Sequence, residues 1–288
     1  MFSVRSDKRG DLDTVVLADE VAGSSATIVP ERGALAISLF AHGREWLYLD
    51  ESTLRDRTAN VRGGIPVLFP SPGKLTDDTF AWSGKSGAMK QHGFARNSRF
   101  HEIARGTEGG AWVELELCDS EATRAAFPFA FRLRLRFRLW GSHLGVRADV
   151  QNTGEGLLPF ALGYHPYFAV PVADKASCRI PTAATRAWDN QRKRDVTLGP
   201  IDLAEGEVDL HLHDHGSNGA TLETPSGSVD LGGHFTRWVI WTLPSKDFVC
   251  LEPWTAPADA LNTGEGLVEL GPGAGRCLEL TLGVRREP

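Results

Sequence analysis

The chain has 288 residues, of which 41% are hydrophobic and 24% are charged, and its formal net charge is −6. These proportions are ordinary for a globular protein. The acidic balance argues against a nucleic-acid partner, because neutralising phosphates requires a basic surface. The four cysteines are scattered without a C-x-x-C pair, which argues against a zinc site and against a disulfide framework.

The N-terminal segment, MFSVRSDKRGDLD, lacks the apolar stretch of a signal peptide. No run of the sequence approaches the roughly 20 apolar residues that span a bilayer. The sequence therefore predicts a cytoplasmic protein without a membrane partner, and it makes no prediction of oligomeric state.

Short strand-like segments alternate with turns along most of the chain. The clearest is Phe129–Trp140, in which apolar residues alternate with four arginines. This period of two predicts a strand with one buried face and one solvated face. Seven further candidates, in chain order, are Ala34–Phe40, Ser98–Ala104, Ala111–Leu117, 144–151, Arg237–Leu243, Phe248–Leu251 and Cys277–Val284.

No long stretch has the 3.6-residue period and the caps of an amphipathic helix, and strands do not alternate with helices as in a nucleotide-binding parallel sheet. Many short strands with frequent turns predict an all-β fold, a large antiparallel β-sandwich. We expect one catalytic domain over residues 1–288. The polar segment Thr185–Asp195 is expected to be an exposed loop.

Four segments place polar or titratable groups in apolar, turn-rich surroundings: RGGIPVLFP from Arg62, QHGFAR around His92, LGYHPYF around His165, and CLEPW around Glu252. Proline holds His165 extended, and the neighbouring aromatic rings suit the C–H faces of a sugar. A partly desolvated Glu252 at a strand end would be a stronger base. Each segment also has an ordinary structural interpretation: a surface arginine, a loop imidazole bonded to a carbonyl, an aromatic core corner, or a rim glutamate.

Together and in this order, the four segments resemble the aldose 1-epimerase (galactose mutarotase-like) family, including its hexose-6-phosphate 1-epimerase branch. The resemblance covers nearly the whole chain. It implies a β-supersandwich whose active site lies in a concave cleft. It also implies a small-molecule partner, a sugar or sugar phosphate, and anomer interconversion without a metal or other cofactor.

The resemblance implies a role for each candidate residue. His165 would be the general acid that protonates the ring oxygen, and Glu252 the general base that removes the proton from the anomeric hydroxyl. His92 would polarise or hold the ring-oxygen region. Arg62 and Asp209 would bind sugar hydroxyls, with Asp214 as the alternative to Asp209.

The substrate remains open between two kinds of sugar. Arg62 and Arg96 match positions that hold phosphate in the phosphosugar branch, which implies glucose 6-phosphate as the alternative substrate. The stretch Ser71-Pro72-Gly73 departs from that branch, where a tryptophan and an aromatic-glycine pair usually stand, and it favours an unphosphorylated aldose.

Two other functions are considered. Glycoside hydrolysis usually needs two facing carboxylates, whereas the motifs here offer a histidine and a glutamate. A non-catalytic carbohydrate-binding protein would keep the aromatic rings and arginines but would not need both His165 and Glu252.

Overall fold

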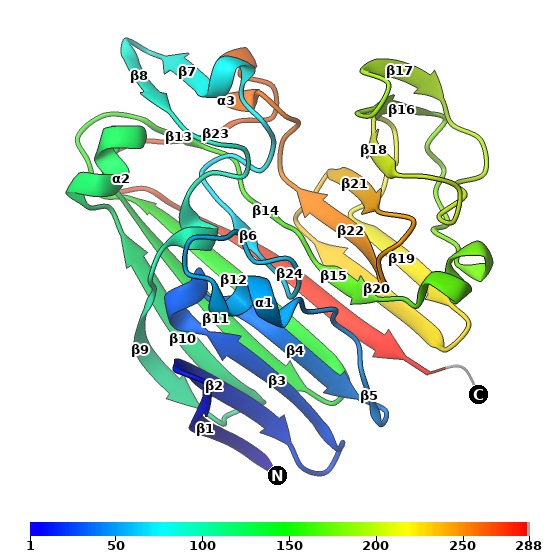
Figure 1. Cartoon of the computed structure of the whole chain (residues 1–288). Coiled ribbons are helices and arrows are strands. Elements are labelled where there is room, and N and C mark those ends of the chain that lie inside the picture. The colour runs from blue at the N-terminus through cyan, green and yellow to red at the C-terminus, as the bar shows by residue number, and fades with distance from the viewer. Residues whose placement is uncertain (287–288) are drawn as a thin grey trace.

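A computed structural model describes residues 1–286, and antiparallel sheets make up most of it (Figure 1). The first sheet is a five-stranded meander in chain order at the N-terminus. Its strands are β1 (Phe2–Arg9), β2 (Leu12–Asp19), β3 (Ser24–Val29), β4 (Leu35–Ala41) and β5 (Arg44–Glu45). Strand β2 packs against two strands of the second sheet, β10 (Ala111–Cys118) and β11 (Phe131–Trp140).

The second sheet has seven strands in the order β19-β20-β24-β12-β11-β10-β9. They are β9 (His101–Gly106), β10 (Ala111–Cys118), β11 (Phe131–Trp140), β12 (His143–Asn152), β19 (Gly219–Thr224), β20 (Gly227–Gly233) and β24 (Gly275–Arg285). Along β11, residues such as Leu135 and Phe137 are buried, while Arg136 and Arg138 are exposed. The predicted arginine-bearing solvated face is therefore confirmed.

The third sheet, which carries the candidate site, has the order β17-β16-β18-β21-β22-β14-β6, with β15 also pairing with β22. Its strands are β6 (Val67–Leu68), β14 (Gly163–Tyr164), β15 (Tyr167–Ala169), β16 (Arg186–Asp189), β17 (Arg194–Thr197), β18 (Val208–Leu212), β21 (Arg237–Thr242) and β22 (Phe248–Trp254). In Figure 1 the N-terminal strands and β16–β18 lie at opposite ends of the molecule.

The remaining elements are short. Two small two-stranded sheets are the hairpin of β7 (Thr79–Trp82) with β8 (Lys85–Ala88), and the pair of β13 (Leu158–Phe160) with β23 (Val268–Leu270). The α-helices are α1 (Glu51–Arg55), α2 (Glu121–Ala126) and α3 (Ala260–Thr263). Single 3-10 turns are η1 (Pro30–Arg32), η2 (Thr76–Asp78) and η3 (Ala95–Asn97), and η4 spans Val172–Ser177. None of the helices in residues 1–286 has the length and apolarity needed to cross a membrane.

One cluster of buried side chains joins the three large sheets, with Leu17 from the first, Phe137 from the second, and Ile240 and Leu251 from the third. The predicted all-β sandwich architecture is confirmed. The extent of the catalytic domain, residues 1–288, stays a prediction.

Two predictions of local structure are wrong. Thr185–Asp195 is not simply an exposed loop, because β16 pairs with β18 and buries Ala187, and β17 returns beside it. The turn between β16 and β17 is closed by the Asp189 carboxylate, which accepts from the backbone N–H groups of Gln191 and Arg192. The strand expected over Ser98–Ala104 begins only at His101, because the preceding residues bond to the η1 region instead, with Phe100 N donating to Pro30 O.

Candidate active site

A cavity of about 330 Å³ opens on the face of the third sheet that carries Glu252, between the sheet and the loops around Arg62 and His92. The structure brings all six residues predicted from the sequence to the wall of this cavity: Arg62, His92, Arg96, His165, Asp209 and Glu252. The four sequence segments therefore converge on one place, although they are far apart along the chain.

Alternation along β22 aims Glu252 into the cavity. Val249 and Leu251 belong to the main hydrophobic core, so Cys250, Glu252 and Trp254 face the opposite side. Glu252 is only 2% exposed although it borders the cavity. Burial of the carboxyl group, together with the nearby charge of Asp209, raises the pKa of Glu252 well above its ordinary value.

His165 lies between β14 and β15 and meets Glu252. Its Nε2 lies 3.3 Å from Glu252 Oε1, and both side chains are almost fully buried. Its backbone N–H donates to Pro66 O, which ties the segment to the first motif. Burial lowers the pKa of His165 well below its ordinary value, and the neighbouring His92 and Arg96 act in the same direction. Burial therefore disfavours the charged form of both members of the His165–Glu252 pair.

Aromatic side chains orient the two members of the pair. The His165 ring stacks on Tyr167, with centroids 4.6 Å apart and planes 7° apart, and meets the edge of Trp241. The indole N–H of Trp254 donates to the second oxygen of Glu252, Oε2, over 3.2 Å. Each oxygen of the buried carboxylate thus has its own neighbour.

His92 lies behind the pair, with its ring centroid 5.4 Å from that of His165. The motif that carries it is fixed to the first motif through Gly93, which pairs with Phe69. Gly93 has a φ of 66°, and a Cβ there would lie 2.2 Å from Phe69 O, so only glycine fits. Burial is the main reason that the pKa of His92 is lowered to about 3.

Of the two candidate aspartates, only Asp209 lines the cavity. Asn190 Nδ2 donates to Asp209 Oδ2 over 2.7 Å, and His211 Nε2 lies 3.3 Å from Oδ1. Asp214 lies elsewhere on the surface and accepts from the backbone and hydroxyl of Thr185, which lowers the pKa of Asp214 to about 2. The preference for Asp209 therefore agrees with the geometry.

The two arginines differ in exposure. Arg62 is exposed, whereas Arg96 is partly buried, and burial lowers the pKa of the Arg96 guanidinium. Arg96 Nη2 donates to Gln91 O over 3.3 Å. Within residues 1–286, neither arginine has a carboxylate oxygen within 4.0 Å. Both cations therefore border the cavity without a direct counter-ion.

A model of the family described as "Aldose 1-epimerase" matches residues 13–217. The chain belongs to the aldose 1-epimerase family. This family membership makes it an isomerase that acts on a sugar or a sugar phosphate.

Three similar proteins of this family or fold illustrate the match. A protein of Cenchrus ciliaris, named "Putative glucose-6-phosphate 1-epimerase", is 30% identical over 245 residues, which are 74% of this chain and 69% of that protein. A crystal structure of a protein from Synechocystis sp. PCC 6803 is 33% identical and covers all of both chains, with a TM-score of 0.92. A galactose mutarotase-like protein from Clostridium acetobutylicum shares the fold at 19% identity, with a TM-score of 0.84 over 99% of both chains.

Sequence reasoning did not single out four polar side chains that line this cavity: Asn60, Asn190, His211 and Trp241. His211 follows Asp209 by two positions on β18, and Trp254 follows Glu252 by two on β22. The period of a strand could therefore have found His211 once Asp209 was chosen, as it places alternate residues on one face. Nothing in the sequence marked Asn190, because it lies in the segment expected to be an exposed loop.

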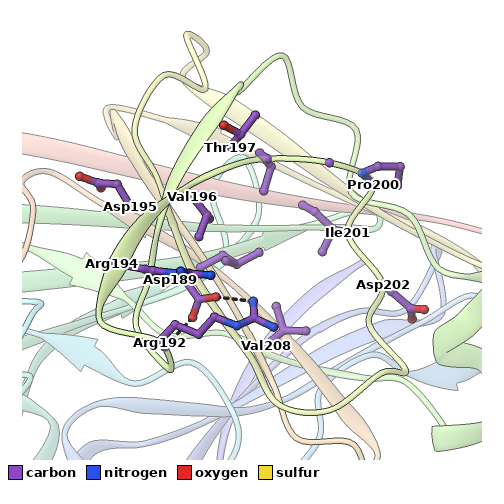
Figure 2. A pocket seen from close by; sticks show the side chains of 13 residues that line it. Asp189, Arg192, Arg194, Asp195, Val196, Thr197, Pro200, Ile201, Asp202 and Val208 are labelled. Atoms are coloured by element: carbon purple, nitrogen blue, oxygen red, sulfur yellow. Dashed lines mark hydrogen bonds and ion pairs between the residues drawn. The ribbon is translucent and has the colours of Figure 1, made fainter.

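A larger cavity of about 520 Å³ lies near the same strand but not at the site (Figure 2). Its wall includes Val208 and Leu210, which alternate along β18 with Asp209 and His211 and so face the other way. Its buried carboxylate, Asp189, already accepts from Arg192 over 2.8 Å. The six candidate residues therefore line the smaller cavity and not this one. Across the described part of the chain, no three His, Cys, Asp or Glu side chains are grouped as metal ligands.

Proposed function

We propose that this family member interconverts the α and β anomers of a hexose by acid–base ring opening, with glucose 6-phosphate preferred over the free sugar. The observation that carries the proposal is the buried pair on the cavity wall, in which His165 Nε2 lies 3.3 Å from Glu252 Oε1. The hydroxyl and ring oxygens of a cyclic sugar are bonded to the same anomeric carbon. A base that removes the proton of the anomeric hydroxyl and an acid that protonates the ring oxygen must therefore lie close together.

Ring opening uses the pair in its charged form. The Glu252 carboxylate removes the proton from the anomeric hydroxyl, and the His165 imidazolium protonates the ring oxygen as the bond from that oxygen to the anomeric carbon breaks. The resulting aldehyde rotates and presents its other face. On closure the ring hydroxyl attacks the aldehyde carbon, His165 takes its proton back, and Glu252 returns its proton to the anomeric oxygen.

The other predicted residues would hold the sugar in place for these steps. Asp209 can accept from sugar hydroxyls, since its carboxylate lines the cavity and is fixed by Asn190. Arg62 can donate to oxygens at the open side of the cavity. Correct placement matters because acid–base transfer requires the reacting atoms to be within hydrogen-bond reach.

Two observations support a phosphorylated substrate. Arg62 and Arg96 border the cavity without a carboxylate within 4.0 Å among residues 1–286, and a phosphate would neutralise them through paired, charge-assisted hydrogen bonds. The Cenchrus ciliaris relative is named for glucose 6-phosphate. The stretch Ser71-Pro72-Gly73, which favours a neutral aldose, does not line the cavity and therefore does not oppose phosphate binding there.

The proposal is tested by following anomer interconversion of α-glucose, α-galactose and α-glucose 6-phosphate side by side, each corrected for its spontaneous rate. We expect catalysis, with kcat/KM for the phosphosugar at least roughly 10-fold above that for either free sugar. A higher rate for a free sugar would overturn the phosphate preference. Saturable binding without acceleration would favour the carbohydrate-binding alternative.

Arg96→Ala is expected to raise KM for glucose 6-phosphate by roughly 10-fold or more, because a charge-assisted contact is worth about 1.5–3 kcal/mol. The KM for glucose should change little. Arg99→Ala is the matched control, since Arg99 is exposed and lies outside the cavity. Equal losses for both sugars would mean that Arg96 is structural.

Trp254→Phe is expected to lower kcat by about 10-fold, because the variant loses one hydrogen bond to a charged group and the free energy of such a bond corresponds to a factor of about ten. The variant keeps an aromatic ring but removes the N–H that favours the ionised carboxylate, so the pKa of Glu252 should rise further. The alkaline limb of the kcat/KM profile should then move to higher pH. Trp241→Phe is the control, because the Trp241 N–H donates to Glu207 and not to Glu252. An unmoved limb in Trp254→Phe would contradict this role.

A further inference from the structure

His92 makes a hydrogen bond that determines which ring nitrogen carries its proton. Its Nδ1 lies 2.5 Å from the backbone oxygen of Pro72. A carbonyl oxygen can only accept, so the ring must donate from Nδ1. A neutral imidazole carries one N–H, and therefore Nε2 of a neutral His92 is an acceptor.

Both partners of this hydrogen bond are fixed by their surroundings. On the acceptor side, Gly73 follows Pro72 and packs so closely that a Cβ there would lie 2.5 Å from Ala258 Cα. On the donor side, His92 has a φ of 75°, a left-handed conformation that is costly for a residue with a Cβ. The backbone after it is held by Phe94 and Ala95, whose N–H groups donate to Phe69 O. The backbone on both sides of this hydrogen bond is therefore fixed.

The groups that face His92 favour its neutral form on balance. These are Arg96 from its own loop, His165 from the β14–β15 segment, Asp209 and His211 from β18, and the Trp254 ring from β22. Burial and the positive charge of Arg96 lower the pKa of His92 to about 3 and outweigh the opposite effect of Asp209. The ring is therefore uncharged at physiological pH.

We propose that His92 offers Nε2 to the substrate as a hydrogen-bond acceptor, so that it recognises a sugar hydroxyl and does not donate to the ring oxygen. The ring oxygen of a cyclic sugar and the oxygens of a phosphate dianion carry no hydrogen, so an acceptor nitrogen cannot bind them. Only the hydroxyls of the sugar can donate to it. His92 is thus a specificity-determining residue, and the proton for the ring oxygen comes from His165 alone. The inference rests on the proposed function for its choice of a sugar ligand.

The tautomer is tested on the free protein by nitrogen-15 NMR of labelled histidine rings, with His92→Gln used to assign the His92 signals. We expect a protonated Nδ1 and an unprotonated Nε2, with no titration between about pH 5 and 8, the interval in which an ordinary histidine changes its charge. A proton on Nε2, or titration of the ring within that interval, overturns the proposal. This readout requires no turnover, so it stands even if the proposed epimerase activity fails.

The ligand contact is tested with analogues of glucose 6-phosphate in which one hydroxyl at a time is replaced by fluorine, which cannot donate. In the unmodified protein, one replacement should weaken binding by about 10-fold. In His92→Phe that same replacement should have no further effect, whereas His92→Gln, which keeps an acceptor oxygen, should retain part of the discrimination. If every replacement weakens binding equally in all three proteins, His92 does not recognise a hydroxyl and the proposal is wrong.

Discussion

Glu252→Gln is expected to lower kcat by about 10²-fold or more, because the amide cannot remove the proton from the anomeric hydroxyl. The two side chains have nearly the same shape, and the amide oxygen can still accept from the Trp254 indole. The loss should therefore appear in kcat much more than in KM. The measurement is anomer interconversion at saturating sugar. Near-normal activity in the purified variant would show that Glu252 is not the base.

The same variant has a stability signature that separates lost chemistry from lost folding. Burial raises the pKa of Glu252 above its value in the unfolded chain, about 4.3. A group with a raised folded pKa stabilises the fold below the unfolded pKa, and this contribution is lost as pH rises toward the folded pKa. Gln does not ionise, so the variant should have a higher Tm than the unmodified protein at neutral pH. The difference should widen as pH rises from about 4.3. A lower Tm at pH 7 would point to a damaged fold.

The fold could be predicted wherever one strand face is buried and the other is wet. Phe129–Trp140 shows this alternation, and β11 lies there. Of the N-terminal sheet, β4 was predicted but β1 to β3 were not. Strand β2 is buried at nearly every position and therefore has no period of two. Strand β16 was missed for another reason: its backbone pairs with β18, a strand distant in the sequence, which a local pattern cannot reveal.

The site residues could be named from short motifs, but their arrangement could not. A glutamate after an apolar run such as Glu252 and a histidine before proline such as His165 are visible in the sequence, although β22 continues past the strand end expected at Leu251. Their 3.3 Å separation arises from the pairing of β14 and β15 with β22. The choice between Asp209 and Asp214 likewise depends on which strand face borders the cavity. The tautomer of His92 depends on a carbonyl twenty residues away in the chain, at Pro72.

His165→Asn is expected to lower kcat by about 10²- to 10⁴-fold, the usual contribution of a positioned acid. Asparagine cannot supply a proton to the ring oxygen, although it is small enough to fit between Tyr167 and Trp241. The control is His213→Asn, because His213 is a half-exposed histidine that pairs with Asp195 away from the cavity. The control should keep full activity.

The pH dependence of kcat/KM distinguishes an acid from a structural histidine. In the unmodified protein, burial lowers the pKa of His165 and raises that of Glu252, and the active form of the pair is the one that holds a single proton. The profile should have a wide plateau, with an acid limb where a second proton binds the pair and an alkaline limb where the pair loses its only proton. In His165→Asn, only the glutamate remains, and it is active only as the carboxylate. The residual activity should then rise with pH along a single limb, through the raised pKa of Glu252. If the variant keeps the plateau of the unmodified protein at reduced height, His165 contributes no proton and acts only by holding Glu252 in place.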